Sequence, residues 1–225
     1  MKVIFAETRS KAKITIPGKE ISKLPKSVAL ATTVQFIGQL DAVKKELESA
    51  GLKVFVGKGR RTKYPGQVLG CDSSAAISAD ADAVLYIGTG FFHPVGIALQ
   101  VEKPVFVFDP ALGKIEELPK ERVDAVRRKR KGALLKFLNS EKIGILVSVK
   151  PGQNLLPLAL EIKKKLESQG KKAYVLAFDT VDFSELENFP FIECFLNLAC
   201  PRISEDYERI VKPVADYYDV KEFLK

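Results

Sequence analysis

Short runs of apolar residues alternate with segments of helical period over the first half of the chain. The apolar runs are bounded by glycine, proline or aspartate, which is typical of buried strands. The intervening segments place apolar residues three and four positions apart, as one face of a helix does. Strand and helix in alternation predict a parallel sheet covered by helices. We expect strands at residues 28–31, 52–56, 82–87 and 104–108, a helix at 38–50 and a long charged helix at 121–138.

The pattern then restarts, with expected strands at 143–149, 173–177 and 191–198, a helix at 155–168 and a short helix at 220–224. The string LESAGLK at 47–53 returns as LESQGKK at 166–172, and a glutamine follows the first strand of each copy, Gln35 and Gln153. The loop Gly88-Thr89-Gly90 then corresponds to Ala199-Cys200-Pro201. Two helix–strand units can share such spacing by chance, but the shared string favours an internal repeat. The predicted fold is α/β, with two repeated Rossmann-like modules whose parallel sheets are covered by helices.

Residues 1–25 fit neither module. Segments 3–6 and 12–16 could be strands, and prolines and glycine at 17, 18 and 25 mark breaks between them and the first module. We therefore expect an N-terminal arm over 1–25, a first α/β module over 26–139 and a second over 140–225.

The composition narrows the class of protein. The chain has 225 residues, three cysteines, one histidine and a net charge of +8. An odd number of cysteines disfavours a disulfide framework, and a single histidine excludes a centre of several histidines. Neither a signal peptide nor an apolar stretch of the ~20 residues of a membrane span is visible. We expect a cytoplasmic protein with reduced thiols.

A dense run of positive charge stands at 127–131, RRKRK. On a helix such a run covers most of the circumference, so part of it must be solvated. It is either a solvated linker helix or a docking surface for an acidic protein or RNA. No aromatic residue is interleaved, which disfavours base stacking and makes nucleic acid the weaker candidate.

The three cysteines differ in their surroundings. Cys71 precedes an alanine-rich helical stretch, where the helix dipole would favour the thiolate, the form that ligates metals; the alternative is a small buried residue of that helix. Cys200 follows a strand, at the edge where open parallel sheets bind ligands. Cys194 lies within that strand and reads as a core thiol. No CxxC pair exists, so a zinc ribbon and a thioredoxin site are disfavoured.

The loop Gly88-Thr89-Gly90, followed by His93 and Pro94, is the most distinctive one. Two glycines at the end of a strand allow a ligand to approach the backbone closely, and the following helix start offers N–H groups to an anion. Pro94 should hold His93 extended, where it could hydrogen-bond a carboxylate or a ribose. The alternative is a tight turn with a capping histidine.

Several strings together resemble the archaeal diphthamide synthase family, the 2-(3-amino-3-carboxypropyl)histidine synthases. They occur in the family's order and spread over most of residues 27–205. The strings are LATTVQ at 30–35, YPGQVLGC at 64–71, IGTGFFHP at 87–94, VKPGQ at 149–153 and NLACPR at 197–202.

The resemblance implies a three-module plan in which each module donates one cysteine to a [4Fe–4S] cluster. It implies that the cluster cleaves S-adenosylmethionine to release a 3-amino-3-carboxypropyl radical, which adds to a histidine of translation elongation factor 2. By this resemblance Cys71 and Cys200 are ligands. Gln35, Gly88, Thr89, Gly90, His93 and Gln153 would bind the cofactor S-adenosylmethionine, and the protein would be a homodimer.

The chain departs from that plan at its start, because the first module and its cysteine are largely absent, and residues 1–25 resemble only the end of that module. Cys194 is a poor replacement, since strand rise separates it from Cys200 by ~20 Å. A third ligand must come from a partner subunit, in a homodimer or hetero-oligomer, or from a non-cysteine side chain or solvent.

Two functions follow from the resemblance. The first is an enzyme, a shortened 3-amino-3-carboxypropyl transferase. The alternative is a non-catalytic paralogue or subunit that pairs with a full-length synthase or another protein. A nucleotide or RNA binder is the third hypothesis, which rests on the charge alone.

Overall fold

The computed structural model describes residues 4, 6–204 and 212–224 of the chain. The chain divides into two compact units, Met1–Val123 and Asp124–Lys225. The division falls inside the long helix α5 (Lys120–Asn139), whereas the sequence pattern predicts the boundary of the modules at residue 139. In the described part of the chain, no helix is long and apolar enough to cross a membrane.

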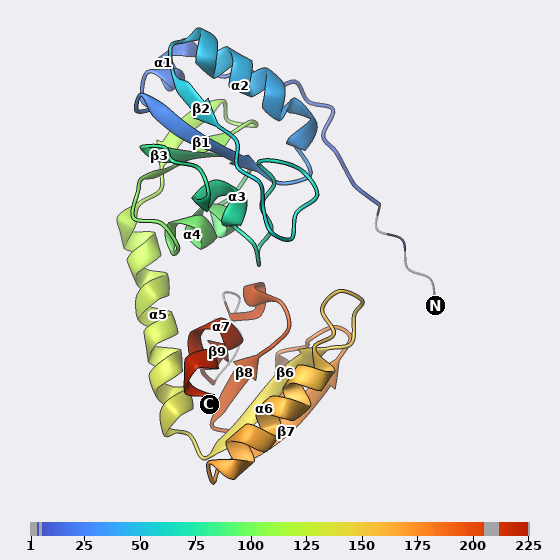
Figure 1. Cartoon of the computed structure of the whole chain (residues 1–225). Coiled ribbons are helices and arrows are strands. Elements are labelled where there is room, and N and C mark those ends of the chain that lie inside the picture. The colour runs from blue at the N-terminus through green and yellow to red at the C-terminus, as the bar shows by residue number, and fades with distance from the viewer. Residues whose placement is uncertain (1–3, 5, 205–211, 225) are drawn as a thin grey trace. The chain divides into compact units, whose positions relative to one another are not determined.

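Unit 1 is built on a five-stranded sheet with the strand order β2-β1-β3-β4-β5 (Figure 1). The first four strands in that order pair in parallel, and β5 pairs with β4 in antiparallel orientation. Its strands are β1 (Ser27–Thr32), β2 (Lys53–Phe55), β3 (Ala83–Ile87), β4 (Val105–Asp109) and β5 (Lys114–Glu117); its helices are α1 (Gly18–Ile21), the 3-10 turn Ile37–Gln39, α2 (Leu40–Ser49), α3 (Ser74–Ile77) and α4 (Phe92–Ala98).

Alternate side chains of each strand in unit 1 enter two different layers. Val28 and Leu30 of β1 pack with Val43 and Leu47 of α2 in one buried cluster. Because successive strand residues point to opposite faces, Tyr86 of β3 lies on the other face, which α3 and α4 cover. Fully burying each of these aliphatic side chains contributes about 1.5–3 kcal/mol.

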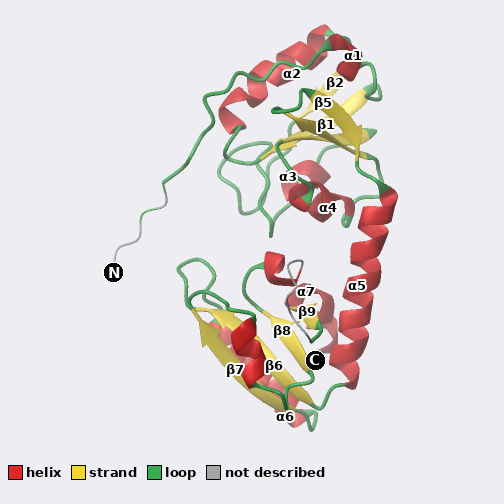
Figure 2. Cartoon of the chain, turned by 180° about the vertical axis from the view of Figure 1, so that it is seen from behind, coloured by secondary structure: helices red, strands yellow, loops and turns green. Residues whose placement is uncertain are grey.

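Unit 2 repeats this plan in a four-stranded parallel sheet with the order β7-β6-β8-β9 (Figure 2). Helix α6 packs on β6 and β7. The elements are β6 (Lys142–Ser148), α6 (Leu156–Ser168), β7 (Lys172–Phe178), the 3-10 turn Ser184–Asn188, β8 (Cys194–Asn197), the 3-10 turn Pro201–Ser204, β9 (Val214–Asp216), α7 (Tyr217–Val220) and the 3-10 turn Lys221–Phe223.

The repeated string ends a helix in the same way in both units. Gly51 has a φ of +90° and Gly170 a φ of +81°. In unit 1 the Leu52 N–H bonds to the Leu47 carbonyl, and in unit 2 the Lys171 N–H bonds to the Leu166 carbonyl. Each is the 6→1 bond of a Schellman motif, which needs a left-handed residue and therefore favours glycine. The predicted fold class, two repeated α/β modules, is thus confirmed.

The structure corrects several predicted elements. Residues 12–16 form no strand, while Ile14 and Ile16 are buried in the core of unit 1. Part of the proposed strand at 3–6 lies outside the described residues. The strand expected at 191–198 is only Cys194–Asn197, and the helix expected at 220–224 starts three residues earlier and ends as a 3-10 turn. Strands β5 and β9 were not predicted, because β5 carries a single apolar residue, Ile115, and β9 has only three residues.

Candidate functional site

Cys71 lies on a two-residue turn. The Leu69 N–H donates to the Asp72 carbonyl at 2.9 Å, and the Asp72 N–H donates to the Leu69 carbonyl at 3.1 Å. This reciprocal pair leaves Gly70 and Cys71 at the tip, where Cys71 is exposed to solvent. The helix expected after Cys71 is present as α3, but it begins only at Ser74 and has four residues, so Cys71 does not lie in its first turn. The alternative of a buried helical cysteine is wrong.

The Asp72 carboxylate ties down the base of this turn. It is buried, and it accepts the Arg61 N–H at 2.6 Å and the Ser74 N–H at 3.0 Å, together with the Ser74 hydroxyl. Burial alone would raise the pKa of Asp72, but the hydrogen bonds from Ser74 and Arg61 outweigh it and lower that pKa. Asp72 is therefore a charged anchor whose oxygens are already engaged.

The segment before the turn is fastened to the end of β1. The Thr32 N–H donates to the Gly66 carbonyl at 2.9 Å, and the Val68 N–H donates to the Thr32 carbonyl at 2.8 Å. The Thr32 hydroxyl donates to the Ile87 carbonyl at 2.7 Å and so joins the ends of β1 and β3. Gly66 has a φ of +71°, and a Cβ there would lie 2.3 Å from a Leu40 methyl carbon. Only glycine therefore fits at this crossing.

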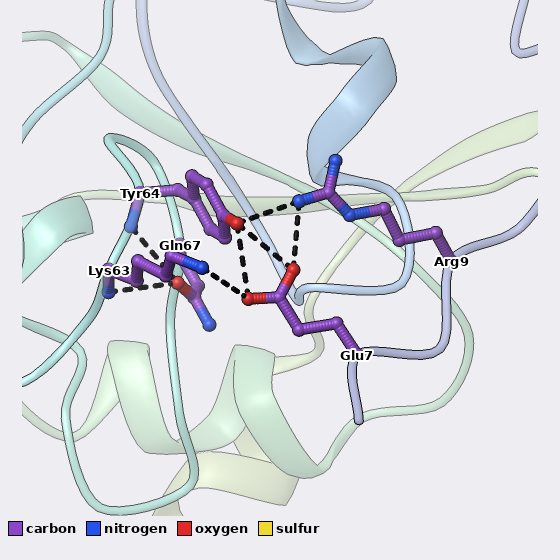
Figure 3. Close-up of polar contacts among 5 residues, drawn as sticks. All are labelled: Glu7, Arg9, Lys63, Tyr64 and Gln67. Atoms are coloured by element: carbon purple, nitrogen blue, oxygen red, sulfur yellow. Dashed lines mark hydrogen bonds and ion pairs between the residues drawn. The ribbon is translucent and has the colours of Figure 1, made fainter. Parts of the chain in front are cut away.

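The N-terminal arm is pinned to the same loop. Figure 3 shows the Glu7 carboxylate between Arg9, Lys63 and Tyr64. It accepts from Arg9 at 2.8 Å, from Lys63 at 3.1 Å and from the Tyr64 hydroxyl at 3.0 Å. These hydrogen bonds, that of Arg9 first, lower the pKa of Glu7 to about 2. The Gln67 side-chain oxygen accepts the Lys63 and Tyr64 N–H groups and holds this part of the loop. Through Glu7, the arm is therefore bonded to the loop that leads to Cys71.

The start of α4, which follows the glycine loop, lies against the Cys71 turn. Gly88 directly follows the last residue of β3, and Thr89 and Gly90 are exposed. The Phe92 ring occupies the place of a Gly70 side chain, since a Cβ there would lie 2.6 Å from it. This contact joins the Cys71 turn to the first residue of α4, two residues after the glycine loop.

His93 is helical, and the expectation that Pro94 holds it extended is wrong. Both residues lie in the first turn of α4 (Phe92–Ala98), where a proline is tolerated because its missing N–H would have no helical partner. The His93 ring stacks on the Tyr86 ring at a centroid distance of 5.8 Å and meets the Phe92 ring edge-on at 5.0 Å. The histidine is thus held by aromatic side chains.

The two predicted glutamines are both exposed, in different units. Gln35 follows β1, and its carbonyl accepts the Ser10 N–H at 2.7 Å, so the arm passes beside it. Gln153 lies in the loop after β6, next to Gly152 with a φ of +81°. Within unit 1, Gln35 and the glycine loop follow neighbouring strands at the same edge of the sheet.

Cys200 lies in unit 2, in the loop after β8, and is partly exposed. The buried Asn197 amide organises this loop. It donates to the Cys200 carbonyl at 2.9 Å and to Asp216 at 2.8 Å, and it accepts the Ala199 N–H at 3.0 Å. Arg130 in turn lies 3.6 Å from Asp216 and 3.5 Å from Asp219. One residue of the basic run thereby has a structural role in unit 2.

Cys194 is fully buried in the core of unit 2, as the sequence indicated. Its thiol donates to the Pro213 carbonyl at 3.3 Å. Burial raises the pKa of Cys194 to about 12, so it stays a neutral thiol near pH 7. A neutral core thiol does not suit an iron ligand.

The donor chemistry fits an iron–sulfur ligand at two positions. Among the described residues, Cys71 and Cys200 are the thiols that solvent reaches, one in each unit. The part of the chain that the structure describes contains no group of three or more His, Cys, Asp or Glu side chains placed to hold a metal ion. Each cysteine stands on a loop whose backbone is fixed by a buried polar side chain, Asp72 or Asn197. Sequence reasoning missed both anchors, although each stands within three residues of its cysteine.

These features define a class of protein: a tandem of Rossmann-like units, each with one accessible cysteine beyond its strands. The family described as "Putative diphthamide synthesis protein" matches the whole chain, residues 1–225. The chain belongs to this diphthamide synthesis family, which confirms the resemblance found in the sequence.

The relatives show how much of the family's plan the chain covers. It is 38% identical over 207 residues to the 2-(3-amino-3-carboxypropyl)histidine synthase of Pyrococcus horikoshii, covering 91% of this chain and 59% of that one. The Methanocaldococcus jannaschii synthase is 30% identical, with 89% of this chain and 52% of that one covered. Subunit 1 of the human synthase is 27% identical, with 88% of this chain and 45% of that one covered. The chain therefore spans about half the length of these relatives.

A solved structure of a relative has the same fold as this chain. The crystal structure of Dph2 from Pyrococcus horikoshii with a 4Fe-4S cluster superposes with a TM-score of 0.79 at 36% identity, over 92% of this chain and 59% of that one. The relative thus carries a cluster on the same fold.

Proposed function

We propose that the chain is an iron–sulfur protein that uses S-adenosylmethionine to transfer a 3-amino-3-carboxypropyl group to a histidine of translation elongation factor 2. Family membership and the cluster of the Pyrococcus relative support it. The observation that carries it is the contrast among the three cysteines. Cys71 and Cys200 are accessible on anchored loops, whereas Cys194 is a buried neutral thiol.

Cys71 and Cys200 would each bind one iron of a [4Fe–4S] cluster as thiolates. The bound cluster would supply the electron that cleaves S-adenosylmethionine at the bond to its 3-amino-3-carboxypropyl group. A two-residue turn suits Cys71 for this role, because its backbone bonds and the Asp72 anchor hold the backbone from which the thiol projects. The third ligand would come from another subunit, in a homodimer or hetero-oligomer, or from a side chain other than cysteine.

Substrate binding falls to the loops at the carboxyl ends of the strands. Gly88, Thr89 and Gly90 would let the amino-acid end or the ribose approach the backbone, with His93 and Gln35 beside them. Gln153 would play the corresponding part in unit 2. Arg128 and Lys131 are exposed on α5, and such basic side chains would speed the docking of an acidic protein.

Anaerobic purification with iron and sulfide analysis tests the proposal. We expect a brown protein that binds iron after reconstitution and cleaves S-adenosylmethionine. The double variant Cys71→Ala, Cys200→Ala should lose the iron, and the matched variant Cys194→Ala should keep it. A colourless protein after reconstitution, or equal iron in the double variant, would overturn the assignment.

A second function has its own support. Relatives from human and Caenorhabditis elegans are named subunit 1, so related chains act within larger assemblies. The chain would then be a non-catalytic partner of a longer synthase. In that case iron would bind only to the mixed complex, and the chain alone would not cleave S-adenosylmethionine. Failure to co-purify with a longer family member would count against this role.

A further inference from the structure

Residues 57–66 form a closed surface loop between β2 and α3, which we call the basic loop. The Gly66 N–H donates to the Gly57 carbonyl at 2.7 Å and closes the neck of this loop. Gly59 is buried inside it, and a Cβ at that position would meet the Thr62 side chain. A compact loop whose ends meet and whose own residues fill its interior is an Ω-loop, a class that frequently carries function.

The basic loop contains no carboxylate. Its charged residues are all basic and all exposed to solvent: Lys58, Arg60, Arg61 and Lys63. Lys63 pairs with the Glu7 carboxylate of the N-terminal arm, as Figure 3 shows. In the part of the chain that the structure describes, no carboxylate forms an ion pair with Lys58 or Arg60. Two cations of the loop are therefore available to an outside partner.

The backbone of the basic loop is fixed close to the Cys71 turn. The Arg60 N–H donates to the Ser74 hydroxyl at 2.8 Å, and the Arg61 N–H donates to the Asp72 carboxylate at 2.6 Å. Because Asp72 directly follows Cys71, the middle of the loop is bonded to the segment that carries the candidate ligand. A loop that is held in place before binding loses less conformational entropy when a partner docks.

Two classes of macromolecule carry the negative charge that such a loop attracts, nucleic acids and acidic proteins. Proteins that bind single-stranded nucleic acid stack its bases on aromatic rings. Tyr64 is the one aromatic residue of the basic loop, and the Arg9 guanidinium carbon lies 5.0 Å and Lys63 Nζ 5.1 Å from the centre of its ring. Its hydroxyl bonds to Glu7. The ring is thus engaged by side chains of the protein itself, which favours an acidic protein as the partner.

We propose that the basic loop is a docking surface for an acidic segment of a partner protein, which it holds beside Cys71. Lys58 and Arg60 form the ion pairs with that segment, while the backbone bonds keep the loop in shape. Complementary charge of this kind speeds the encounter of two proteins and sets their orientation. That the partner is elongation factor 2 rests on the proposed function, whereas the docking surface itself does not.

Titration of the full chain, without added iron, with a fluorescently labelled poly-glutamate peptide tests the surface. The ionic strength is about 0.1 M, where the Debye length is ~10 Å and distant charges are screened. The double variant Lys58→Gln, Arg60→Gln should weaken binding on the order of fivefold, as the loss of two exposed ion pairs does. Arg60→Lys keeps the charge and should bind as the parent chain does.

The matched control is Lys26→Gln, Lys53→Gln. It removes the same charge from two exposed residues of unit 1 at the amino ends of β1 and β2, whereas the basic loop follows the carboxyl end of β2. The control should change binding by less than about twofold, because its charges are distant and screened. Acetylation followed by mass spectrometry should show that the bound peptide protects Lys58 and leaves Lys26 reactive.

No binding by the parent chain, equal weakening in the two double variants, or no protection of Lys58 would each overturn the docking surface. Single-stranded oligouridylate should bind more weakly than the peptide. Tighter binding of this RNA that the loop variant loses would make the loop a nucleic-acid surface and overturn the assignment to a protein. If the peptide binds through the loop and purified elongation factor 2 does not bind, the docking surface stands and the partner in the proposed function is wrong.

Discussion

The two units share one strand order but carry their cysteines on different connections. In unit 1 Cys71 lies between β2 and β3, on a turn held by the Asp72 carboxylate. In unit 2 Cys200 lies directly after β8, in a loop held by the Asn197 amide. The repeat therefore extends to the sheet and the helix caps but not to the site. Apolar spacing specifies the sheet, whereas each loop depends on a polar side chain that the other unit lacks.

The largest expected effect is a difference between the two units in how their stability falls at alkaline pH. Burial raises the pKa of Cys194 in unit 2 from 9.0 to about 12 and that of Tyr86 in unit 1 from 10.0 to about 12. Both groups are neutral in the fold, so stability is complete below the unfolded pKa and falls as pH rises toward the folded one. Unit 2 should lose stability from about pH 9, by on the order of 4 kcal/mol at the upper limit.

Alkaline denaturation monitored by hydrogen exchange in each unit measures this difference. Cys194→Ala should flatten the pH dependence of unit 2 and leave that of unit 1 intact. An unchanged alkaline profile in Cys194→Ala would show that another group drives the loss.

The next effect concerns the two sheets. Gly144 in β6 pairs with Phe195, where β1 has Ala29 opposite Val84. A Cβ at Gly144 would lie 2.7 Å from the Phe195 ring and 2.8 Å from an Ile192 methyl carbon. Gly144→Ala should lower the free energy of unfolding by about 3 kcal/mol, the upper end for overpacking a core.

Chemical denaturation followed in each unit tests this prediction. Adding Phe195→Leu should recover part of the loss, because it frees the space. Gly132→Ala in α5 is the control, since no atom lies within 4 Å of its Cβ, and it should be neutral or slightly stabilising. Equal stability of Gly144→Ala and the parent chain would contradict the close packing of this strand pair.

The side chains that anchor the two cysteine loops, Asn197 and Asp72, should contribute similarly to stability. Asn197→Ala removes the side-chain donor to the Cys200 carbonyl and to Asp216, and Asp72→Ala removes the carboxylate that accepts the Arg61 and Ser74 N–H groups. Each should cost about 2 kcal/mol, as unsatisfied buried groups do. Alkylation followed by mass spectrometry should show faster modification of Cys200 in the first variant and altered modification of Cys71 in the second. If either substitution changes both cysteines equally, the loops are not independently anchored.

The smallest effect is confined to the arm of unit 1. Glu7→Gln removes the charge that Arg9 and Lys63 share, on a surface where ion pairs stabilise little. Since the pKa of Glu7 is lowered to about 2, the network persists above the ordinary value of 4.5 and is lost as pH falls toward 2. Hydrogen exchange of residues 58–67 should rise in the variant at pH 7, with global stability nearly unchanged. Lys44→Gln, on a separate ion pair of α2, is the control.

Much of the fold could be predicted because it depends on local signals. The buried strands β1, β3 and β6 are continuous apolar runs, and Gly51 and Gly170 end their helices in the same motif. Strand β5 could not be predicted, since Lys114–Glu117 has one apolar residue and pairs only because β4 presents an open edge. The helical backbone of His93 was not predicted, because the first turn of a helix such as α4 tolerates a proline, whereas the rule for a residue before proline favours an extended chain.

The sequence by itself determined the repeat, the family and the identity of the cysteines that stand in family strings. These depend on residue spacing, which can be read along the chain. The tertiary structure decided which thiols solvent reaches, that Asp72 and Asn197 hold the loops, and that Tyr86 meets His93. Burial, hydrogen-bond direction and ring contacts arise between residues on separate elements, so they exist only once the strands are side by side.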